Sequence, residues 1–152
     1  MEKIKPVHIA WLLPFTYLIH LAEEFYAGEG LPVWVSDFFN TSLSADDFLT
    51  INLFGFGLIT FFAIIYSLGL RLNLVLLAFG TLVFMNGLVH ITASIFTASY
   101  APGTISGFFL YIPLGIVTFK KILPQLSGVS QILGILLGIL IHIMVTGIAM
   151  YM

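Results

Sequence analysis

The sequence predicts an all-α membrane protein, a bundle of five transmembrane helices with the N-terminus inside and the C-terminus outside. The prediction rests on composition, on the spacing of apolar runs and on the positions of the basic residues. Hydrophobic residues make up 60% of the 152 residues, charged residues make up 8%, and the mean hydropathy is +1.12. Soluble domains average about 45–50% apolar and about 25% charged residues. A length of 152 residues predicts a single transmembrane helical domain over residues 1–152.

Five apolar runs reach the roughly 20 residues that a helix needs to cross the hydrocarbon core of a bilayer. Residues 72–119 contain no Asp, Glu, Lys or Arg, and this stretch is too long for one helix. The segment Tyr100-Ala-Pro-Gly103 provides the break, because proline lacks an amide donor and glycine permits a turn. The expected helices cover residues 7–26, 49–70, 73–98, 102–119 and 131–151.

The basic residues set the expected orientation. All of them fall before the first run, between the second and third runs, or between the fourth and fifth: Lys3, Lys5, Arg71, Lys120 and Lys121. Basic loops face the cytoplasm, so the opposite, acidic side is expected to face outward across the plasma membrane. Glu23 and Glu24 follow the first run where a signal peptide would have its cleavage region, which favours an uncleaved anchor.

The connection over residues 30–48 is expected to form an outer interfacial loop and helix. Pro32 stands at a suitable first helical position, and the aromatic residues after it recur at roughly helical spacing. Ser44 and Asp47 then resemble a capping box at the start of the second long helix.

Composition also excludes several classes of function. A net charge of −2 and the absence of a basic face argue against a nucleic-acid partner. The chain has no cysteine, so disulfides, iron–sulfur clusters and thiolate catalysis are excluded. Membrane lipids are the expected surroundings, and any metal ion would be held by His, Asp, Glu or Asn.

The segment His20-Leu-Ala-Glu23-Glu24 lies at the end of the first apolar run. Its two glutamates are two of the seven acidic residues in the chain. At about 100° per residue, Glu23 falls about 60° to one side of His20 and Glu24 about 40° to the other. Thr16 and Tyr17 extend the same polar stripe. Ionisable groups inside a membrane cost several kcal/mol unless they are paired, so the stripe is expected to face protein.

Two further runs carry polar groups at a similar depth. Asn86 and His90 are four residues apart on one face, and His142 shares a face with Gly134 and Gly138, whose spacing favours close helix packing. Tyr100 lies at the outer mouth. With a rise of about 1.5 Å per residue, these groups converge with His20 in the outer half of the bundle.

A histidine and a carboxylate one helical turn apart can present ligands to one metal ion, as in carboxylate-bridged helical bundles. The expected metal ligands are His20, Glu23, Glu24, His90 and His142. Such ligands suit Zn, Fe or Mn with a water at an open position. Glu24, Asn86 and Tyr100 are the expected catalytic groups. The pattern favours a metal-dependent enzyme, a hydrolase or an oxidase, that acts on a lipophilic small molecule.

Other interpretations fit the same residues. A metal-free histidine–glutamate pair could move protons on a lipid or sterol-like substrate. A buried His/Glu chain could instead relay protons or ions without being an enzyme. The two glutamates could also merely end the first helix in the headgroup region. The odd number of helices and the glycine face of residues 131–151 are compatible with a homo-oligomer.

The chain resembles the HXXEE-motif family of small prokaryotic integral membrane proteins, whose function is unassigned. Three elements carry the resemblance in order: His20-Leu-Ala-Glu23-Glu24, Asn86-Gly-Leu-Val-His90 and Tyr100-Ala-Pro-Gly103-Thr104. The resemblance covers about residues 8–120 and implies that these polar residues form one constellation, without implying an activity. The five-helix architecture is also similar to that of sterol isomerases with a His/Glu proton shuttle, which matches the metal-free interpretation.

Overall fold

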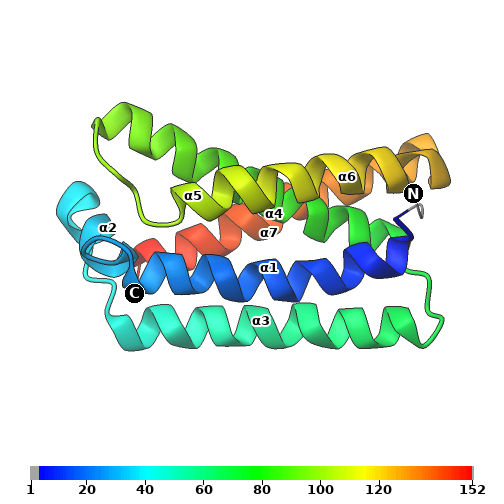
Figure 1. Ribbon diagram of the computed structural model, residues 1–152, viewed down its shortest axis with the longest axis horizontal. Helices are drawn as coiled ribbons and strands as arrows, with labels where there is room; N and C mark the ends of the chain where they lie inside the picture. The colour runs from blue at the N-terminus through cyan, green and yellow to red at the C-terminus, as the bar shows by residue number, and fades with distance from the viewer. Residues whose placement is uncertain (1–3, 152) are drawn as a thin grey trace.

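The computed structural model describes residues 4–151, and every regular element within that range is a helix (Figure 1). The order is α1 (Pro6–Tyr26), α2 (Leu31–Phe39), α3 (Ala45–Ser67), α4 (Asn73–Thr97), α5 (Thr104–Ser106), η1 (Gly107–Tyr111), α6 (Ile112–Ile122), η2 (Leu123–Gln125) and α7 (Gly128–Tyr151). The all-helical prediction is confirmed. Lys3, one of the basic residues used for the orientation, lies outside the described residues.

Four helical stretches among the described residues are long and apolar enough to cross a membrane: Ala45–Ser67, Asn73–Thr97, Thr104–Gln125 and Gly128–Tyr151. They correspond to the last four expected runs. The first expected run forms α1, which lies alongside α3 (Figure 1) but is not among these four. Two histidines, two prolines and two glutamates dilute its apolar residues. Five spans therefore stay a prediction.

The helix boundaries shift where side chains cap the ends. α3 begins at Ala45 instead of residue 49, because the Ser44 Oγ accepts a hydrogen bond from the Asp47 amide at 3.1 Å. α3 also ends at Ser67, three residues before the expected 70, and the following Gly69 has a φ of +106°. The fourth expected helix begins at Thr104 and continues to Gln125, beyond the expected 119.

The helical stretch Thr104–Gln125 contains a π-helical turn, Gly107–Tyr111. The Ile112 amide donates to the Gly107 carbonyl five residues back. Pro113 follows at once; it has no amide to donate, and its ring crowds the preceding turn. A π turn contains one more residue than an α turn, so it rotates the faces on its two sides relative to each other. The 3.6-residue periodicity before this turn therefore does not predict which face the residues after it occupy.

The core forms where α1, α3, α4 and α6 meet, and α7 packs along α4. Gly134 and Gly138 allow α7 to lie close to α4, since a Cβ on Gly138 would meet the Ala78 carbonyl and Thr81. The glycine face of α7 is thus covered by α4 within the chain. Homo-oligomer formation stays a prediction without support from this face.

Replacing Gly138 by leucine is expected to separate α7 from α4 and to lower the unfolding free energy by about 1–3 kcal/mol, the usual cost of overpacking. The measurement is chemical unfolding in detergent micelles. Gly147→Leu on the same helix is the control, because a Cβ there meets nothing within 4 Å. Equal losses in the two variants would contradict close α4–α7 packing.

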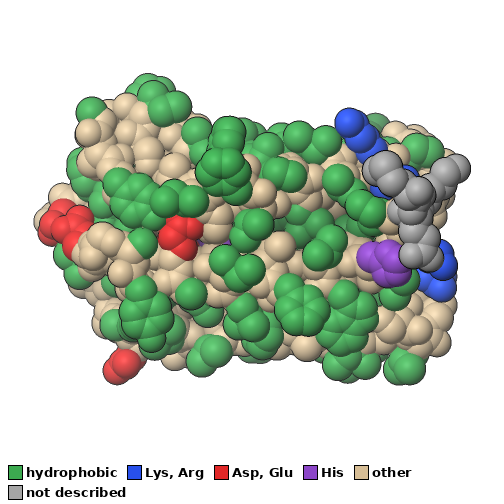
Figure 2. All heavy atoms as spheres, viewed as in Figure 1, with side chains coloured by type: hydrophobic (Ala, Val, Ile, Leu, Met, Phe, Trp, Pro, Cys, Tyr) green, Lys and Arg blue, Asp and Glu red, His purple; other side chains and the backbone are tan. Residues whose placement is uncertain are grey.

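The two ends of the bundle differ in charge. Figure 2 shows acidic side chains at the end near α2 and basic side chains at the opposite end, with apolar side chains between them. Many large apolar residues on the flanks are exposed, among them Phe15, Phe54 and Leu140 at 61%, 70% and 62%. An exposed apolar belt between polar ends is the surface of a membrane protein.

Candidate metal centre

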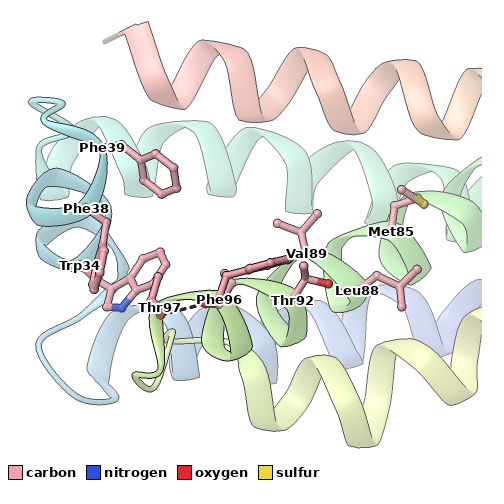
Figure 3. Close-up of a pocket in the computed structure, with 10 residues that line it drawn as sticks. Trp34, Phe38, Phe39, Met85, Leu88, Val89, Thr92, Phe96 and Thr97 are labelled. Atoms are coloured by element: carbon pink, nitrogen blue, oxygen red, sulfur yellow. Dashed lines mark hydrogen bonds between the residues drawn. The ribbon is translucent and has the colours of Figure 1, made fainter.

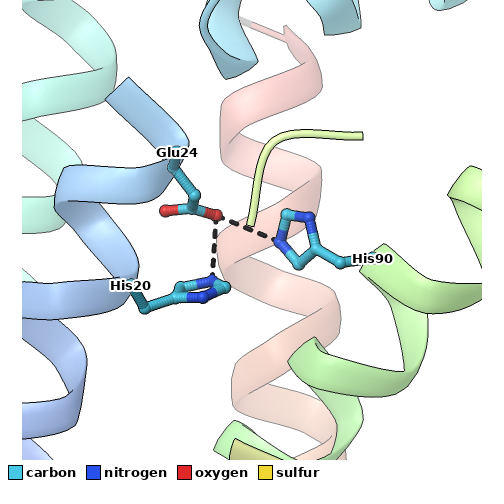
Figure 4. A group of neighbouring side chains, drawn as sticks. All are labelled: His20, Glu24 and His90. Atoms are coloured by element: carbon cyan, nitrogen blue, oxygen red, sulfur yellow. Dashed lines mark ion pairs between the residues drawn. The ribbon is translucent and has the colours of Figure 1, made fainter. Parts of the chain in front are cut away.

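Three of the expected ligands meet inside the bundle. His20 and Glu24 lie one turn apart on α1, and His90 faces them from α4 (Figure 4). The Glu24 Oε1 lies 3.2 Å from the His20 Nε2 and 3.1 Å from the His90 Nε2. The two imidazole rings are 5.0 Å apart between centroids and stand edge to face at 79°. A single carboxylate oxygen thus lies beside both imidazoles.

The group is almost completely enclosed by protein. Its residues are only 3% (His20), 5% (Glu24) and 6% (His90) exposed. An isolated buried carboxylate is strongly unfavourable, so this one requires a compensating charge or hydrogen bonds.

The geometry suits one metal ion. Each of the three residues offers a ligand atom, and these atoms all lie within 4.8 Å of one another. Tetrahedral ligands at about 2.1 Å from a metal are about 3.4 Å apart, close to both carboxylate–imidazole separations. Two imidazoles and a carboxylate form a donor set typical of Zn or Fe sites that keep positions open for water.

The His20 imidazole supports this interpretation. Its Nδ1 lies 2.7 Å from the Ser106 Oγ, which holds the ring in place. Its Nε2 is buried and makes no hydrogen bond, although the Glu24 Oε1 lies within ion-pair distance. The separation is short enough, but the alignment that a hydrogen bond needs is lacking. A buried polar atom without a partner costs about 1–3 kcal/mol, which a ligand at this position would offset.

The loop between α4 and α5 covers both imidazoles. Ala101, Pro102 and Gly103 are buried, and Gly103 has a φ of +98°. A Cβ on Gly103 would lie 2.8 Å from the His90 Nδ1 and 2.9 Å from the His20 Cε1. Only a glycine brings this backbone so close to the two rings.

Glu23 points away from the group of three, toward the start of α5. Its carboxylate accepts hydrogen bonds from the Tyr100 hydroxyl at 2.6 Å, the Ile105 amide at 2.8 Å and the Ser106 amide at 2.6 Å. Free amides and the helix dipole favour a negative charge at a helix N-terminus. The two adjacent glutamates therefore contact different parts of the structure: Glu24 lies beside the two imidazoles, and Glu23 binds the start of α5.

Tyr100 is a donor in this arrangement. Partial burial and the hydrogen bond to the Glu23 carboxylate raise the pKa of the Tyr100 hydroxyl above its ordinary value. The hydroxyl thus stays protonated at every pH near neutrality and keeps donating to Glu23. Tyr100 is 39% exposed and lies on the loop that covers the imidazoles, and its expected place at the outer mouth stays a prediction.

The remaining expected residues lie outside the group of three. Asn86 is one turn before His90 on α4, and its buried Oδ1 has no hydrogen-bond partner. His142 is 8% exposed on α7, the helix that packs along α4. A role for His142 as a ligand stays a prediction.

Sequence reasoning missed Ser106 and the contact that Tyr111 makes. The Tyr111 ring lies 4.2 Å from the His20 ring between centroids, and Tyr111 is 2% exposed. The π turn sets its direction, so no periodic pattern indicates it. Ser106 follows Gly103 by three residues, and that proximity is the only signal for it in the sequence.

The comparison with protein families agrees with this constellation. A family model described as "Protein of unknown function with HXXEE motif" matches residues 11–118, more than half of the chain. The chain belongs to the HXXEE-motif family. The matched range contains all three clustered residues, together with Glu23, Gly103 and Ser106, whereas His142 lies outside it. Neither the curated proteins nor the solved structures compared with the chain give a match.

Proposed function

We propose that this HXXEE-family member is a metal-dependent membrane enzyme, a hydrolase or an oxidase that acts on a lipophilic small molecule. The observation that carries the proposal is the buried group of His20, Glu24 and His90, in which the His20 Nε2 lacks a hydrogen bond. A metal ion held by these three residues would satisfy that nitrogen and offset the charge of the Glu24 carboxylate. Zn, Fe and Mn are the candidate ions.

The proposed membrane arrangement is a single transmembrane domain of five spans in the plasma membrane, with the N-terminus inside. Four spans are long and apolar enough by themselves, and α1 packs alongside α3 as the fifth. The basic end of the bundle then faces the cytoplasm (Figure 2), in agreement with the positive-inside rule. The metal centre lies in the outer half, near α2 and the acidic end.

The proposed chemistry assigns separate tasks to the residues. A bound metal ion supplies a Lewis acid and lowers the pKa of a bound water. Glu24 is positioned beside both imidazoles and can act as ligand or as base. Asn86 offers an unpaired carbonyl oxygen to a substrate group, and Tyr100 holds the covering loop through Glu23.

A lipophilic substrate is supported by the apolar surroundings. An open groove of about 540 Å³ lies between α2 and α4, lined at one end by Trp34, Phe38 and Phe39 (Figure 3). Along α4 it is lined by Val89 and Ala93, on a face of the helix next to the one that carries His90, and none of His20, Glu24 and His90 lines it. The hydrocarbon part of a substrate, or the chain of a membrane lipid, fits such a surface.

A metal-free acid–base site is the second candidate. The position of the Glu24 Oε1 beside both imidazole Nε2 atoms favours it, because a proton could pass between the three groups. This arrangement supports an isomerase-like reaction on a lipid or sterol-like substrate. Without a substrate, the same groups would support proton or ion transport.

Metal analysis of protein purified without chelator separates these candidates. We expect about one bound metal ion per chain in the wild type, and loss of that ion in His20→Ala and His90→Ala, since each removes a ligand. His8→Ala is the matched control, because His8 is exposed on the first turns of α1, outside the group.

Absence of bound metal after reconstitution with Zn, Fe and Mn would overturn the metal proposal and favour the acid–base site. Proton flux in liposomes that disappears in Glu24→Gln would favour transport instead. Metal retained by both His→Ala variants would place the ion elsewhere in the chain.

A further inference from the structure

His20, Glu24 and His90 are at most 6% exposed, yet a substrate must reach them. We propose that the covering loop, residues 98–103 between α4 and α5, is a gate that opens to admit a substrate to this group. Side chains of α1 and α2 hold the gate shut. The inference rests on the proposed function, because it states how a substrate enters, but neither a metal ion nor a substrate is needed to test it.

The covering loop lies at the end of the bundle near α2 and encloses the group in two layers (Figure 1). Its inner part, Ala101, Pro102 and Gly103, is buried, and a Cβ on Gly103 would clash with both imidazole rings. The Ala101 amide ties this part to α4, because it donates to the Ser94 Oγ at 2.9 Å. The outer part includes the exposed Tyr100. A substrate reaches the three side chains only when a part of their cover moves, and this loop lies directly on two of them.

The backbone of the covering loop contributes little to holding it closed. Neither Ser99 nor Tyr100 makes a backbone–backbone hydrogen bond within the described residues. A residue with a positive φ stands at each end of the loop, Ala98 at +49° and Gly103 at +98°. Alanine seldom adopts the left-handed conformation, so the closed loop is held against a local preference. Segments with few backbone hydrogen bonds open locally more easily than the packed helices around them.

Two side-chain hydrogen bonds fasten the outer part of the loop to neighbouring helices. The Tyr100 hydroxyl donates to the Glu23 Oε1 at the end of α1, at 2.6 Å. The Trp34 Nε1 on α2 donates to the Ser99 Oγ at 3.3 Å. Both anchors are fixed, since Glu23 also accepts from two amides at the start of α5 and Trp34 is 4% exposed. These two hydrogen bonds are the clasps of the gate.

The gate adjoins the apolar groove between α2 and α4. Trp34 and Thr97 line this groove (Figure 3), and both interact with Ser99 of the loop. The Thr97 Oγ1 lies 2.8 Å from the Ser99 Oγ. A molecule whose hydrocarbon part occupies the groove therefore lies next to the loop, and an open loop connects the groove with the enclosed group.

Cysteine reporters measure access to the group, because the chain has no cysteine of its own. Ser106→Cys is nearly isosteric and places a thiol beside His20, at a position that is 4% exposed. Its rate of modification by a small methanethiosulfonate reagent, in metal-free protein in detergent micelles, follows the population of the open loop. Ala101→Cys, at a fully buried position of the loop, is a second reporter in case Ser106→Cys alters the fold. Ser127→Cys, at an exposed serine before α7, gives the rate of an uncovered thiol.

Removing either clasp is expected to speed the modification of the buried reporters. Tyr100→Phe should raise the rate about 10–100-fold, because it deletes a hydrogen bond to a charged group. Trp34→Phe should raise it about 2–10-fold, since the bond that it deletes joins neutral groups. The double variant should show about the product of the two effects, because both clasps stabilise the same closed loop. Tyr66→Phe is the matched control: it also deletes a donating tyrosine hydroxyl, 2.5 Å from the Asn73 Oδ1, at the opposite end of the bundle.

Several outcomes would overturn the gate. If Ser106→Cys and Ala101→Cys react as fast as Ser127→Cys without a clasp variant, the loop does not cover the group. Rates that neither Tyr100→Phe nor Trp34→Phe changes would show that the clasps hold nothing shut, and acceleration by Tyr100→Phe alone would overturn the part assigned to α2. Equal acceleration by Tyr66→Phe would reduce the effect to a general loss of stability. The failure of the gate leaves metal binding untouched, and a protein that binds no metal can still show the gate, so the two proposals fail separately.

Discussion

Glu24→Gln is expected to abolish tight metal binding and to leave the metal-free protein at least as stable as the wild type. The substitution preserves the volume and removes the charge that Glu24 buries beside two imidazoles. The loss of metal affinity should exceed the roughly 10–100-fold effect of an outer partner, because Glu24 is a proposed ligand. In the metal-free state, burying a neutral glutamine avoids the desolvation free energy of several kcal/mol that burying a carboxylate costs.

The measurement is chemical unfolding in detergent micelles with and without Zn²⁺. At a free Zn²⁺ concentration of about 100 times the Kd, the wild type should gain about 2.7 kcal/mol in unfolding free energy, and Glu24→Gln should gain little. Glu29→Gln is the control, because Glu29 is exposed in the turn after α1 and should behave like the wild type.

One result would contradict this account directly. If Glu24→Gln lowers the stability of the metal-free protein by about 3–5 kcal/mol, the carboxylate is half of a buried ion pair with a protonated histidine. The metal-free acid–base site would then be the better description.

Gly103→Ala is expected to have the second large effect, the loss of metal binding together with a less stable fold. The added Cβ would lie 2.8 Å from the His90 ring and 2.9 Å from the His20 ring, closer than real Cβ contacts allow. Either the loop lifts off the imidazoles or both rings rotate away from Glu24. A φ of +98° adds backbone strain of about 1–3 kcal/mol for any residue except glycine.

Gly69→Ala separates the two contributions. Gly69 has a similar φ of +106°, but a Cβ there meets nothing within 4 Å. Both variants should lose stability through strain, and only Gly103→Ala should lose Zn²⁺ binding. Unchanged Zn²⁺ affinity in Gly103→Ala would show that the loop does not hold the imidazoles in place.

The sequence alone determined the features that depend on local periodicity and composition. Long apolar runs dictate helices, since a backbone surrounded by hydrocarbon must satisfy its own hydrogen bonds. One-turn spacing placed His20 and Glu24 on the same face of α1, and the sparse polar residues of the run over residues 73–98 indicated His90 as their partner. His20 and Glu24 are neighbours within one helix. His90 could be paired with them because a polar group buried without a partner is costly.

The tertiary structure decided which carboxylate enters the site. Glu23 and Glu24 flank the face of His20 at similar angles, so helical geometry could not choose between them. Glu24 meets His90 because α4 lies on its side of α1, and Glu23 meets the free amides at the start of α5. The close approach of Gly103, the hydroxyl of Ser106 and the rotation of Tyr111 by the π turn depend equally on neighbours distant in sequence. These contacts are set by how helices pack against one another, which the periodicity of a single helix does not contain.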